Sequence, residues 1–198
     1  MYELPTDKKA GEPRVLYQII YADCPWPFRN YSDKWHETHD KSRWVGRHYS
    51  TMTIDEICGL PISGIADDNC CLFLWSTSPT LKYALRVIEA WGFTYKTKAF
   101  CWAKTNIKSG GFFTGMGFWT RANTEDCFLA TKGHPTRVDK SVRQLLISPR
   151  LSHSEKPPEV RDRIVQLMGD LPRIELFARR KVAGWDCWGN EVESDIEL

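Results

Sequence analysis

The chain has 198 residues and a mass of 22.9 kDa, which is enough for one well-filled core and lies near the upper end of the common single-domain range. Hydrophobic residues make up 42% and charged residues 26% of it, proportions that exclude an intrinsically disordered chain. The formal net charge of +2 is too small to indicate a nucleic-acid-binding protein by itself. We therefore predict one globular domain over 1–198, with flexible tails at 1–14 and 192–198.

Apolar runs bounded by turn residues recur along the chain and lack polar alternation, as strands buried on both faces do. They predict strands at 16–22, 71–76, 98–103, 127–131, 145–147 and 174–178. Helical patterns lie between them. Thr53 is placed to cap a short helix over 53–60. A second helix follows Pro79, with Leu81, Leu85 and Ile88 on one face, and a third follows Pro157-Pro158, with Val160, Ile164, Leu167 and Met168 on one face.

Strands that alternate with helices predict an α/β fold, in which a mainly parallel sheet is covered on both faces. In such folds ligands bind at the carboxyl ends of the strands. The tetrapeptide "DCPW" (23–26) follows the first predicted strand, and "ARRKVAGWDCWGNE" (178–191) overlaps the end of the last one. Two long stretches with few strand signals, 27–52 and 104–123, are expected to reach over the same rim.

Basic residues gather in one half of the chain. No acid occurs from Cys101 to Thr124, where lysine and arginine alternate with phenylalanine and tryptophan, and Asp139 is the only acid between Thr131 and Arg150. Basic residues interleaved with aromatics are typical of nucleic-acid-binding surfaces.

The tetrapeptide "DCPW" combines an acid, a turn and an aromatic ring in one place. An exocyclic amine on a purine or pyrimidine is a poor nucleophile, because its lone pair is delocalised into the ring. An enzyme that methylates it must accept hydrogen bonds from its two N–H groups, which moves the nitrogen towards tetrahedral geometry. Asp23 Oδ and the Cys24 carbonyl are candidate acceptors, in a turn stiffened by Pro25. Trp26 would stack on the base. A strand that simply ends in a proline turn explains the same residues without chemistry.

"DCPW" resembles the [Asp/Asn/Ser]-Pro-Pro-aromatic motif of amino-group methyltransferases. The chain as a whole resembles the family of the eukaryotic messenger-RNA adenosine-N6 methyltransferase catalytic subunit and its bacterial and phage relatives. The blocks that carry the resemblance, in chain order, are "YADCPWPF", "HYSTM", "FCWAKTN", "GFWTRANTEDCFLATKGHP", "HSEKPPEV" and "IELFARRKVAGWDCWGNE", and they cover nearly everything from 16 to 191. The resemblance implies a Rossmann-like class I methyltransferase fold with permuted motif order, in which the catalytic motif precedes the cofactor-binding strand. It also implies S-adenosylmethionine as cofactor and methyl transfer to the N6 amine of adenine.

By this resemblance, "IELFAR" is the strand whose end meets the cofactor. The positions that match cofactor contacts are Asp23, Lys156, Glu175, Phe177, Arg179, Asn190 and Glu191. Their chemistry fits, because the cofactor's carboxylate suits Lys or Arg, its ribose diol suits Asn or a carboxylate, and its sulfonium suits aromatic faces and carboxylates. An exposed pair between Glu175 and Arg179 and a solvated Lys156 are the simpler explanations.

The resemblance further assigns substrate contacts to Tyr49, Trp119, Arg121 and Glu125, which match the loops that cover the target base. The implied reaction is a direct displacement that needs no strong general base. Asp23 and the Cys24 carbonyl orient the amine, while Trp26 and Tyr49 sandwich the ring. As alternatives, the two aromatics Tyr49 and Trp119 fill a core and Glu125 pairs with Arg121.

Cys24 stands where the family usually has proline. Because the acceptor there is a backbone carbonyl, the hydrogen bond is kept and the turn loses some stiffness, so we expect the change to be tolerated. A Cys at this position is also compatible with adaptation to another target amine.

No metal site is expected. His36, His39 and His48 lie near Asp33 and Asp40, but their spacing matches no standard zinc site. The seven cysteines form no CxxC and indicate reduced thiols in a cytosol-like compartment. The charged, proline-containing start and the absence of a long apolar run predict neither a signal peptide nor a membrane span.

Several alternatives stay open at this point. DNA is the favoured substrate, because the chain is short and has no added recognition domain; RNA adenine and the cytosine amine are the alternatives. A non-catalytic nucleic-acid-binding partner subunit is the second class, and pairing as a homodimer or with a related subunit is expected. The predicted location is the cytoplasm of a bacterium or phage-infected host, or the nucleus in a eukaryote.

Overall fold

The computed structural model describes residues 16–27, 51–117, 119–150 and 155–198. The tail 1–14, Tyr49 and the histidine-containing loop lie outside these ranges. Strands are β1 (Tyr17–Ala22), β2 (Ala66–Ser76), β3 (Thr94–Thr105), β4 (Thr124–Lys132), β5 (Leu145–Pro149), β6 (Arg173–Leu176) and β7 (Asp186–Trp188). Helices are α2 (Ile54–Cys58), α3 (Leu81–Ala90) and α4 (Glu159–Met168), with short 3-10 turns at Ile62–Gly64 and Ser78–Thr80. Among the described residues, no helix is both long and apolar enough to cross a membrane.

The predicted strands are all present, but their bounds differ. β2, β3 and β4 begin earlier than expected, because most of the residues at their starts are polar and lie outside the apolar runs. β6 ends at Leu176, short of the predicted limit of 178. β7 was not predicted, since it has only three residues and one buried side chain. Thr53 caps α2 as expected: its hydroxyl accepts the Glu56 N–H, and the Glu56 carboxylate accepts the Thr53 N–H.

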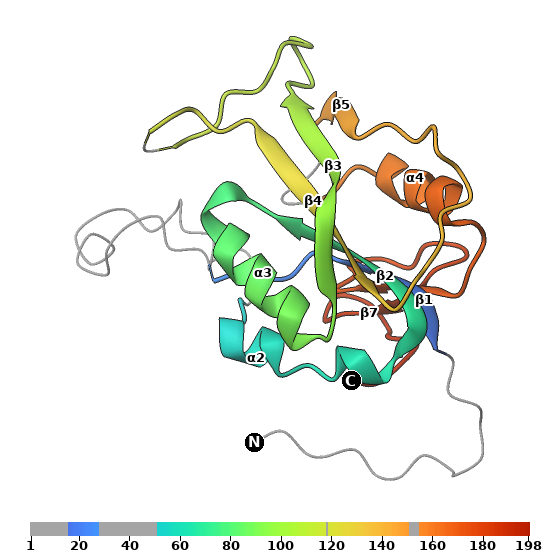
Figure 1. The fold of residues 1–198 in the computed structure, drawn as a ribbon. Coiled ribbons are helices and arrows are strands. Elements are labelled where there is room, and N and C mark those ends of the chain that lie inside the picture. Colours follow the sequence, from blue (N-terminus) through green and yellow to red (C-terminus); the bar gives the residue numbers. More distant parts are fainter. Residues whose placement is uncertain (1–15, 28–50, 118, 151–154) are drawn as a thin grey trace.

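The strands form one seven-stranded sheet in the order β5-β3-β4-β2-β1-β6-β7 (Figure 1). β1 runs parallel to β2 and β6, β6 parallel to β7, and β3 parallel to β5. β4 is antiparallel to both of its neighbours, β2 and β3. The sheet is therefore mainly parallel, as predicted, with one reversed strand that the sequence pattern did not reveal.

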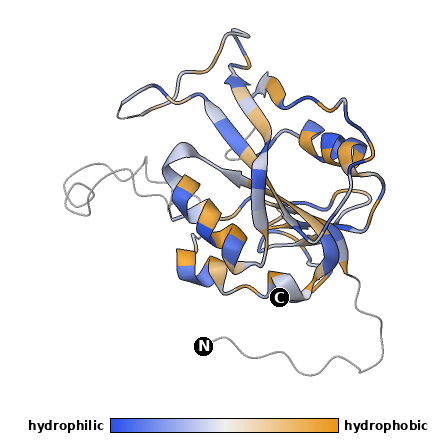
Figure 2. Cartoon of the chain, in the orientation of Figure 1, coloured by the Kyte–Doolittle hydropathy of each residue, from blue (hydrophilic) through white to orange (hydrophobic). Residues whose placement is uncertain are grey.

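Helices cover both faces of the sheet, with α2 and α3 on one side and α4 on the other (Figure 1). Apolar residues concentrate in the central strands and on the helix faces turned towards them (Figure 2). The buried face of α4 matches the prediction, since Val160, Ile164 and Met168 are buried. The predicted face of α3 is wrong in part: Leu81 is exposed, and Ala84 and Val87 are buried with Ile88.

The connections on the two sides of β1 lie on opposite faces of the sheet. From β1 the chain reaches β2 by way of α2, whereas β6, the other neighbour of β1, is entered from α4. Ala22, the last residue of β1, pairs with Leu74 of β2 and Leu176 of β6. In open α/β sheets, such a reversal at the carboxyl ends of the strands marks the place where ligands bind.

Residues 192–198, predicted as a flexible tail, make contacts that a free tail would not make. Asp195 accepts hydrogen bonds from the Cys187 backbone N–H at 2.9 Å and from Lys181 Nζ at 2.8 Å. Ile196 and Leu198 pack against the core on the α2–α3 face. The segment therefore lies against β7 and the core beside it.

Candidate active site

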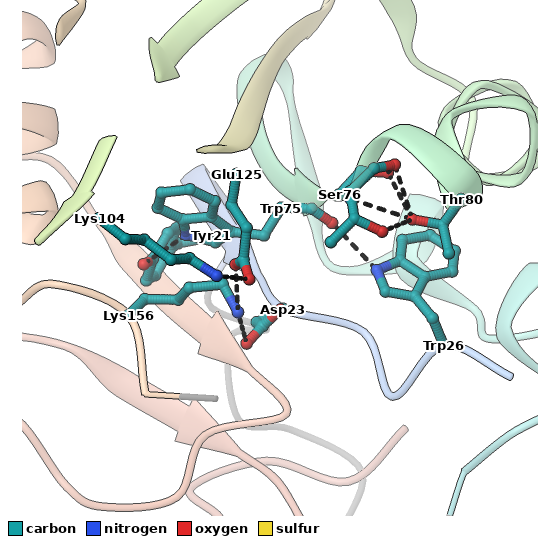
Figure 3. A network of polar contacts seen from close by, with 10 residues as sticks. Tyr21, Asp23, Trp26, Trp75, Ser76, Thr80, Lys104, Glu125 and Lys156 are labelled. Atoms are coloured by element: carbon teal, nitrogen blue, oxygen red, sulfur yellow. Dashed lines mark hydrogen bonds and ion pairs between the residues drawn. The ribbon is translucent and has the colours of Figure 1, made fainter. Parts of the chain in front are cut away.

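Four charged side chains meet where β1, β3 and β4 approach the carboxyl rim of the sheet (Figure 3). Asp23 follows β1 directly, and its Oδ2 lies 2.6 Å from Lys156 Nζ. Lys156 Nζ is also 3.3 Å from Glu125 Oε2. Glu125 Oε1 in turn accepts a hydrogen bond from Lys104 Nζ. The result is an alternating chain of acid and base, which we call the rim network: Asp23, Lys156, Glu125 and Lys104.

The reversed direction of β4 explains how Glu125 reaches this rim. Glu125 is near the start of β4, and Asp126 pairs with Ser76 at the carboxyl end of β2. Lys104 lies near the end of β3, so β3 and β4 deliver opposite charges to the same edge. Lys156 lies shortly before α4 and is held over the Trp75 ring, 5.6 Å from its centroid.

Burial and neighbouring charges set the protonation of the rim network. Burial raises the pKa of Asp23 above its ordinary value; Lys156 opposes this shift, and Glu125 adds to it. Burial also acts against ionised Glu125, but Lys156 and Lys104 overcome it and hold the pKa of Glu125 below its usual range. Burial alone would lower the pKa of Lys156, yet Asp23 and Glu125 raise it well above the ordinary value. Lys156 is therefore a fixed cation at neutral pH.

The "DCPW" segment forms a tight turn. The Trp26 backbone N–H donates to the Cys24 carbonyl at 2.8 Å, with Pro25 between them, and the fixed φ of proline suits such a turn. The Trp26 indole N–H donates to the Trp75 carbonyl at 3.1 Å, which orients the ring (Figure 3). Pro25 O accepts the Met52 N–H at 3.0 Å. These three hydrogen bonds fix the conformation of the turn and the orientation of the Trp26 ring.

The Cys24 thiol does not face the rim. Its side chain is 4% exposed and belongs to the core on the α2–α3 face. Burial, and secondarily Asp23, raise the pKa of this thiol well above its ordinary value. Cys24 therefore acts as a small apolar residue, and only its carbonyl is available for recognition.

The ends of β6 and β7 lie beside the end of β1 at the carboxyl rim of the sheet. Phe177, directly after β6, has a φ of 59°, an uncommon value for a bulky residue, and its ring packs edge-on against Trp188 at 5.3 Å. A Cβ on Gly189 would lie 2.3 Å from the Ala178 carbonyl, so only glycine permits this approach. The close packing places Arg179 next to Glu191, with 3.5 Å between Nε and Oε1.

Glu175 occupies a different environment from the one expected for a cofactor contact. Its carboxylate accepts two hydrogen bonds of 2.7 Å from the Arg161 guanidinium of α4. Both side chains are nearly buried, at 12% and 10% exposure. Because this pair lies on the face covered by α4, the Glu175 carboxylate joins the sheet to this helix and is not available to a ligand at the carboxyl rim.

Sequence comparisons with known proteins all point to one family. Residues 17–191 match the MT-A70 family model. The chain belongs to the MT-A70 family. It is 37% identical to the Type II methyltransferase M.MunI from a Mycoplasma species, over 94% of this chain and 82% of that protein. It is 30% identical to the human N(6)-adenosine-methyltransferase catalytic subunit METTL3 and 28% identical to a Drosophila melanogaster MT-A70-like protein, over 89% of this chain in both cases. It spans only 28% and 27% of those two proteins.

The structure of this MT-A70 domain brings some of the predicted site residues together and leaves others apart. Asp23, Lys156 and Glu125 meet directly. The exposed Arg179, Asn190 and Glu191 lie at the ends of β6 and β7. Trp119 is 99% exposed and Arg121 is exposed too, so neither contacts the network in this conformation.

Lys104 is the member of the rim network that the sequence analysis missed. It lies in the stretch from Cys101 to Thr124, where basic and aromatic residues are interleaved. A usable signal was present, because Lys104 follows a buried strand and the next acid along the chain is Glu125. A cation at the end of one strand and an acid at the start of the next are expected to meet when the two strands are antiparallel neighbours.

Proposed function

We propose that this MT-A70 protein is an S-adenosylmethionine-dependent methyltransferase that acts on the N6 amine of adenine, with DNA as the favoured nucleic acid. The observation that carries the proposal is the position of the "DCPW" turn. It brings a carboxylate and a backbone carbonyl to the carboxyl rim, where the ends of β1 and β6 lie side by side. DNA is favoured because the chain is short and covers 82% of the Type II methyltransferase M.MunI, but only 28% of the N(6)-adenosine-methyltransferase catalytic subunit METTL3.

The residues at the end of β6 and β7 fit the proposed cofactor. Arg179 would hold the cofactor's carboxylate, and Asn190 and Glu191 would accept hydrogen bonds from its ribose hydroxyls. Gly189 lets the backbone after β7 approach Ala178, a contact that any Cβ at this position would block. When bound, S-adenosylmethionine supplies an electrophilic methyl group on a sulfonium.

The residues that follow β1 orient the amine. Asp23 accepts one N–H of the adenine amine, and the Cys24 carbonyl accepts the other on the lone pair that the Trp26 N–H does not use. These two acceptors are held by Lys156 and by the proline turn, so they need little reorganisation during the reaction. Trp26, fixed through its indole N–H, provides a face for the base. As the N–C bond forms, the amine becomes acidic, and Asp23 takes its proton or passes it to water.

The decisive test is transfer of labelled methyl from S-adenosylmethionine to unmethylated single-stranded DNA, duplex DNA and RNA, with the product nucleosides resolved by mass. We expect label in N6-methyladenine, with the highest initial rate on DNA. A higher rate on RNA would reassign the substrate, for which the adenosine-N6 methyltransferase relatives provide the precedent. Label in cytosine would contradict the proposed base.

The second candidate is a non-catalytic partner subunit that binds nucleic acid. A scaffold of this kind is expected to lose the acid of the tetrapeptide or the cofactor residues, whereas Asp23, Lys156, Arg179 and Asn190 are all present. Catalysis is therefore the better-supported function. Light scattering under assay conditions tests the expected pairing, and a strict monomer would count against it.

A basic concavity beside the site is a candidate contact for the nucleic-acid backbone. It is lined by Asn106, Ile107, Lys108 and Ser109 of the loop that follows β3, and by Arg150, which follows β5 (Figure 1). The Arg150 guanidinium lies 3.7 Å from the centroid of the Phe113 ring, which holds this cation in place.

We expect Lys108→Ala and Arg150→Ala each to weaken binding of DNA of any sequence and to reduce the slope of log K against log salt by about 1, the loss of one phosphate contact. Fluorescence anisotropy with a labelled oligonucleotide, measured across a salt series, provides this slope. Lys82→Ala on α3 is the matched control and should leave the slope unchanged. An unchanged slope in both Lys108→Ala and Arg150→Ala would remove the concavity from the interface.

A further inference from the structure

The two carboxylate oxygens of Glu125 contact two different lysines. Oε1 accepts from Lys104, and Oε2 lies 3.3 Å from Lys156 (Figure 3). The side chains of Glu125, Lys104 and Lys156 are 17%, 17% and 10% exposed, so water screens these contacts only weakly. Lys156 in turn divides its N–H groups between Glu125 and Asp23. The strength of the contact between Lys156 and Asp23 therefore depends on whether Glu125 also binds Lys104.

Lys104 is itself held from several directions. The Asn123 side chain accepts the Lys104 backbone N–H at 3.2 Å and donates to the Lys104 carbonyl at 3.0 Å. The Lys104 ammonium lies 5.0 Å from the centroid of the Trp102 ring, and the Trp102 indole N–H donates to the Ser148 carbonyl at 3.1 Å. The cation is thus directed at Glu125 by a backbone and a ring that are both fixed.

We propose that Lys104 is a positioning residue: by satisfying one oxygen of Glu125, it leaves Lys156 on Asp23 and so keeps the Asp23 carboxylate ionised and aimed at the amine. Without Lys104, Glu125 has one lysine partner in place of two. Its uncompensated charge then draws Lys156 away from Asp23. The inference rests on the proposed function for its catalytic consequence, but the network itself can be measured without activity.

The charges around Asp23 set the direction of the expected effect. Those that face it are Lys156, Glu125 and Arg179, with the thiols of Cys24 and Cys127 nearby. Removing the Lys104 charge makes both nearby carboxylates harder to ionise, so the pKa of Glu125 and that of Asp23 rise. Since Asp23 must be ionised to accept the amine N–H, the acid limb of the rate profile moves to higher pH.

The test compares Lys104→Met with the wild type in two measurements. Carboxyl ¹³C NMR titration of labelled Asp and Glu, with Asp23→Asn and Glu125→Gln for assignment, follows the two pKa values directly. We expect the pKa of Glu125 to rise by about one unit, because an opposite charge within contact distance shifts a carboxyl by roughly one to three units, and the pKa of Asp23 to rise by less. Methyl transfer across pH should show a matching shift of the acid limb and a fall in kcat of about 10-fold, with KM for DNA nearly unchanged.

Two control variants separate this role from simple stabilisation. Lys98→Met removes a lysine that also joins β3 to β4, through a 2.8 Å pair with Asp126. It should leave both the carboxyl titrations and the pH dependence of methyl transfer unchanged. Lys104→Arg keeps the positive charge, so the acid limb of its rate profile should lie at the wild-type pH. An unmoved titration of both carboxylates in Lys104→Met overturns the proposal, and so does a higher KM for DNA with unchanged kcat, which would make Lys104 a substrate contact. If the wild type transfers no methyl group, the proposed function fails, and the NMR titration still decides the role of Lys104.

Discussion

Asp23→Asn is expected to lower kcat for methyl transfer by at least about 100-fold, the usual cost of removing one preorganised polar contact to the reacting group. The asparagine keeps the size of the side chain but loses the negative charge, and it can present an N–H where an acceptor is needed. Lys156 still has Glu125 as a partner, so no buried cation is left alone and the fold should persist.

Affinity for S-adenosylmethionine, measured by calorimetry, should stay within a few-fold of wild type, because Arg179, Asn190 and Glu191 are unchanged. Asp55→Asn is the matched control: it alters an exposed carboxylate of α2 that pairs with Arg86 of α3, and it should leave kcat unchanged. Wild-type turnover by Asp23→Asn would remove Asp23 from the reaction.

Arg161→Met is expected to destabilise the fold by roughly 3–5 kcal/mol, because it leaves the Glu175 carboxylate buried and without its guanidinium partner. For a chain of this size the melting temperature should fall by about 10 °C. Urea unfolding of Arg161→Met, of Glu175→Gln and of the double variant provides the coupling energy between the two residues. We expect the double variant to be more stable than the sum of the two single changes predicts.

The control for this prediction is Arg86→Met, which breaks the exposed pair with Asp55 and should cost no more than about 1 kcal/mol. The experiment also tests the resemblance-based assignment of Glu175. A Glu175→Gln variant with unchanged stability and weakened binding of S-adenosylmethionine would favour the cofactor role over the structural one.

Most of the fold was predictable because buried strands and amphipathic helices leave strong local patterns. The apolar run ending at Ala22 and the periodic residues of α4 are examples. The direction of β4 was not predictable, because the same apolar residues are buried whichever way a central strand runs. The rule that ligands meet the carboxyl ends of strands could therefore not place Glu125, which lies near the start of its strand.

The site residues that belong to a sequence motif were predictable. Those whose role depends on a partner from another strand or helix were not. "DCPW" identified Asp23 from sequence, and the resemblance identified Lys156. Glu175 was assigned to the cofactor because it lies in the matching strand, yet alternation along β6 turns it to the face where Arg161 lies. Lys104 was hidden in a basic stretch, because its partner comes from a different strand.

The hydrogen bond between Asp23 and Lys156 joins residues 133 positions apart in the chain. During synthesis Asp23 leaves the ribosome long before Lys156 exists, and closing so long a separation is a slow, late event in folding. The acid of the tetrapeptide therefore acquires its counter-charge only after the central strands have assembled. A chain that ends before Lys156 would carry the motif without this counter-charge, so we expect such a chain to transfer no methyl group.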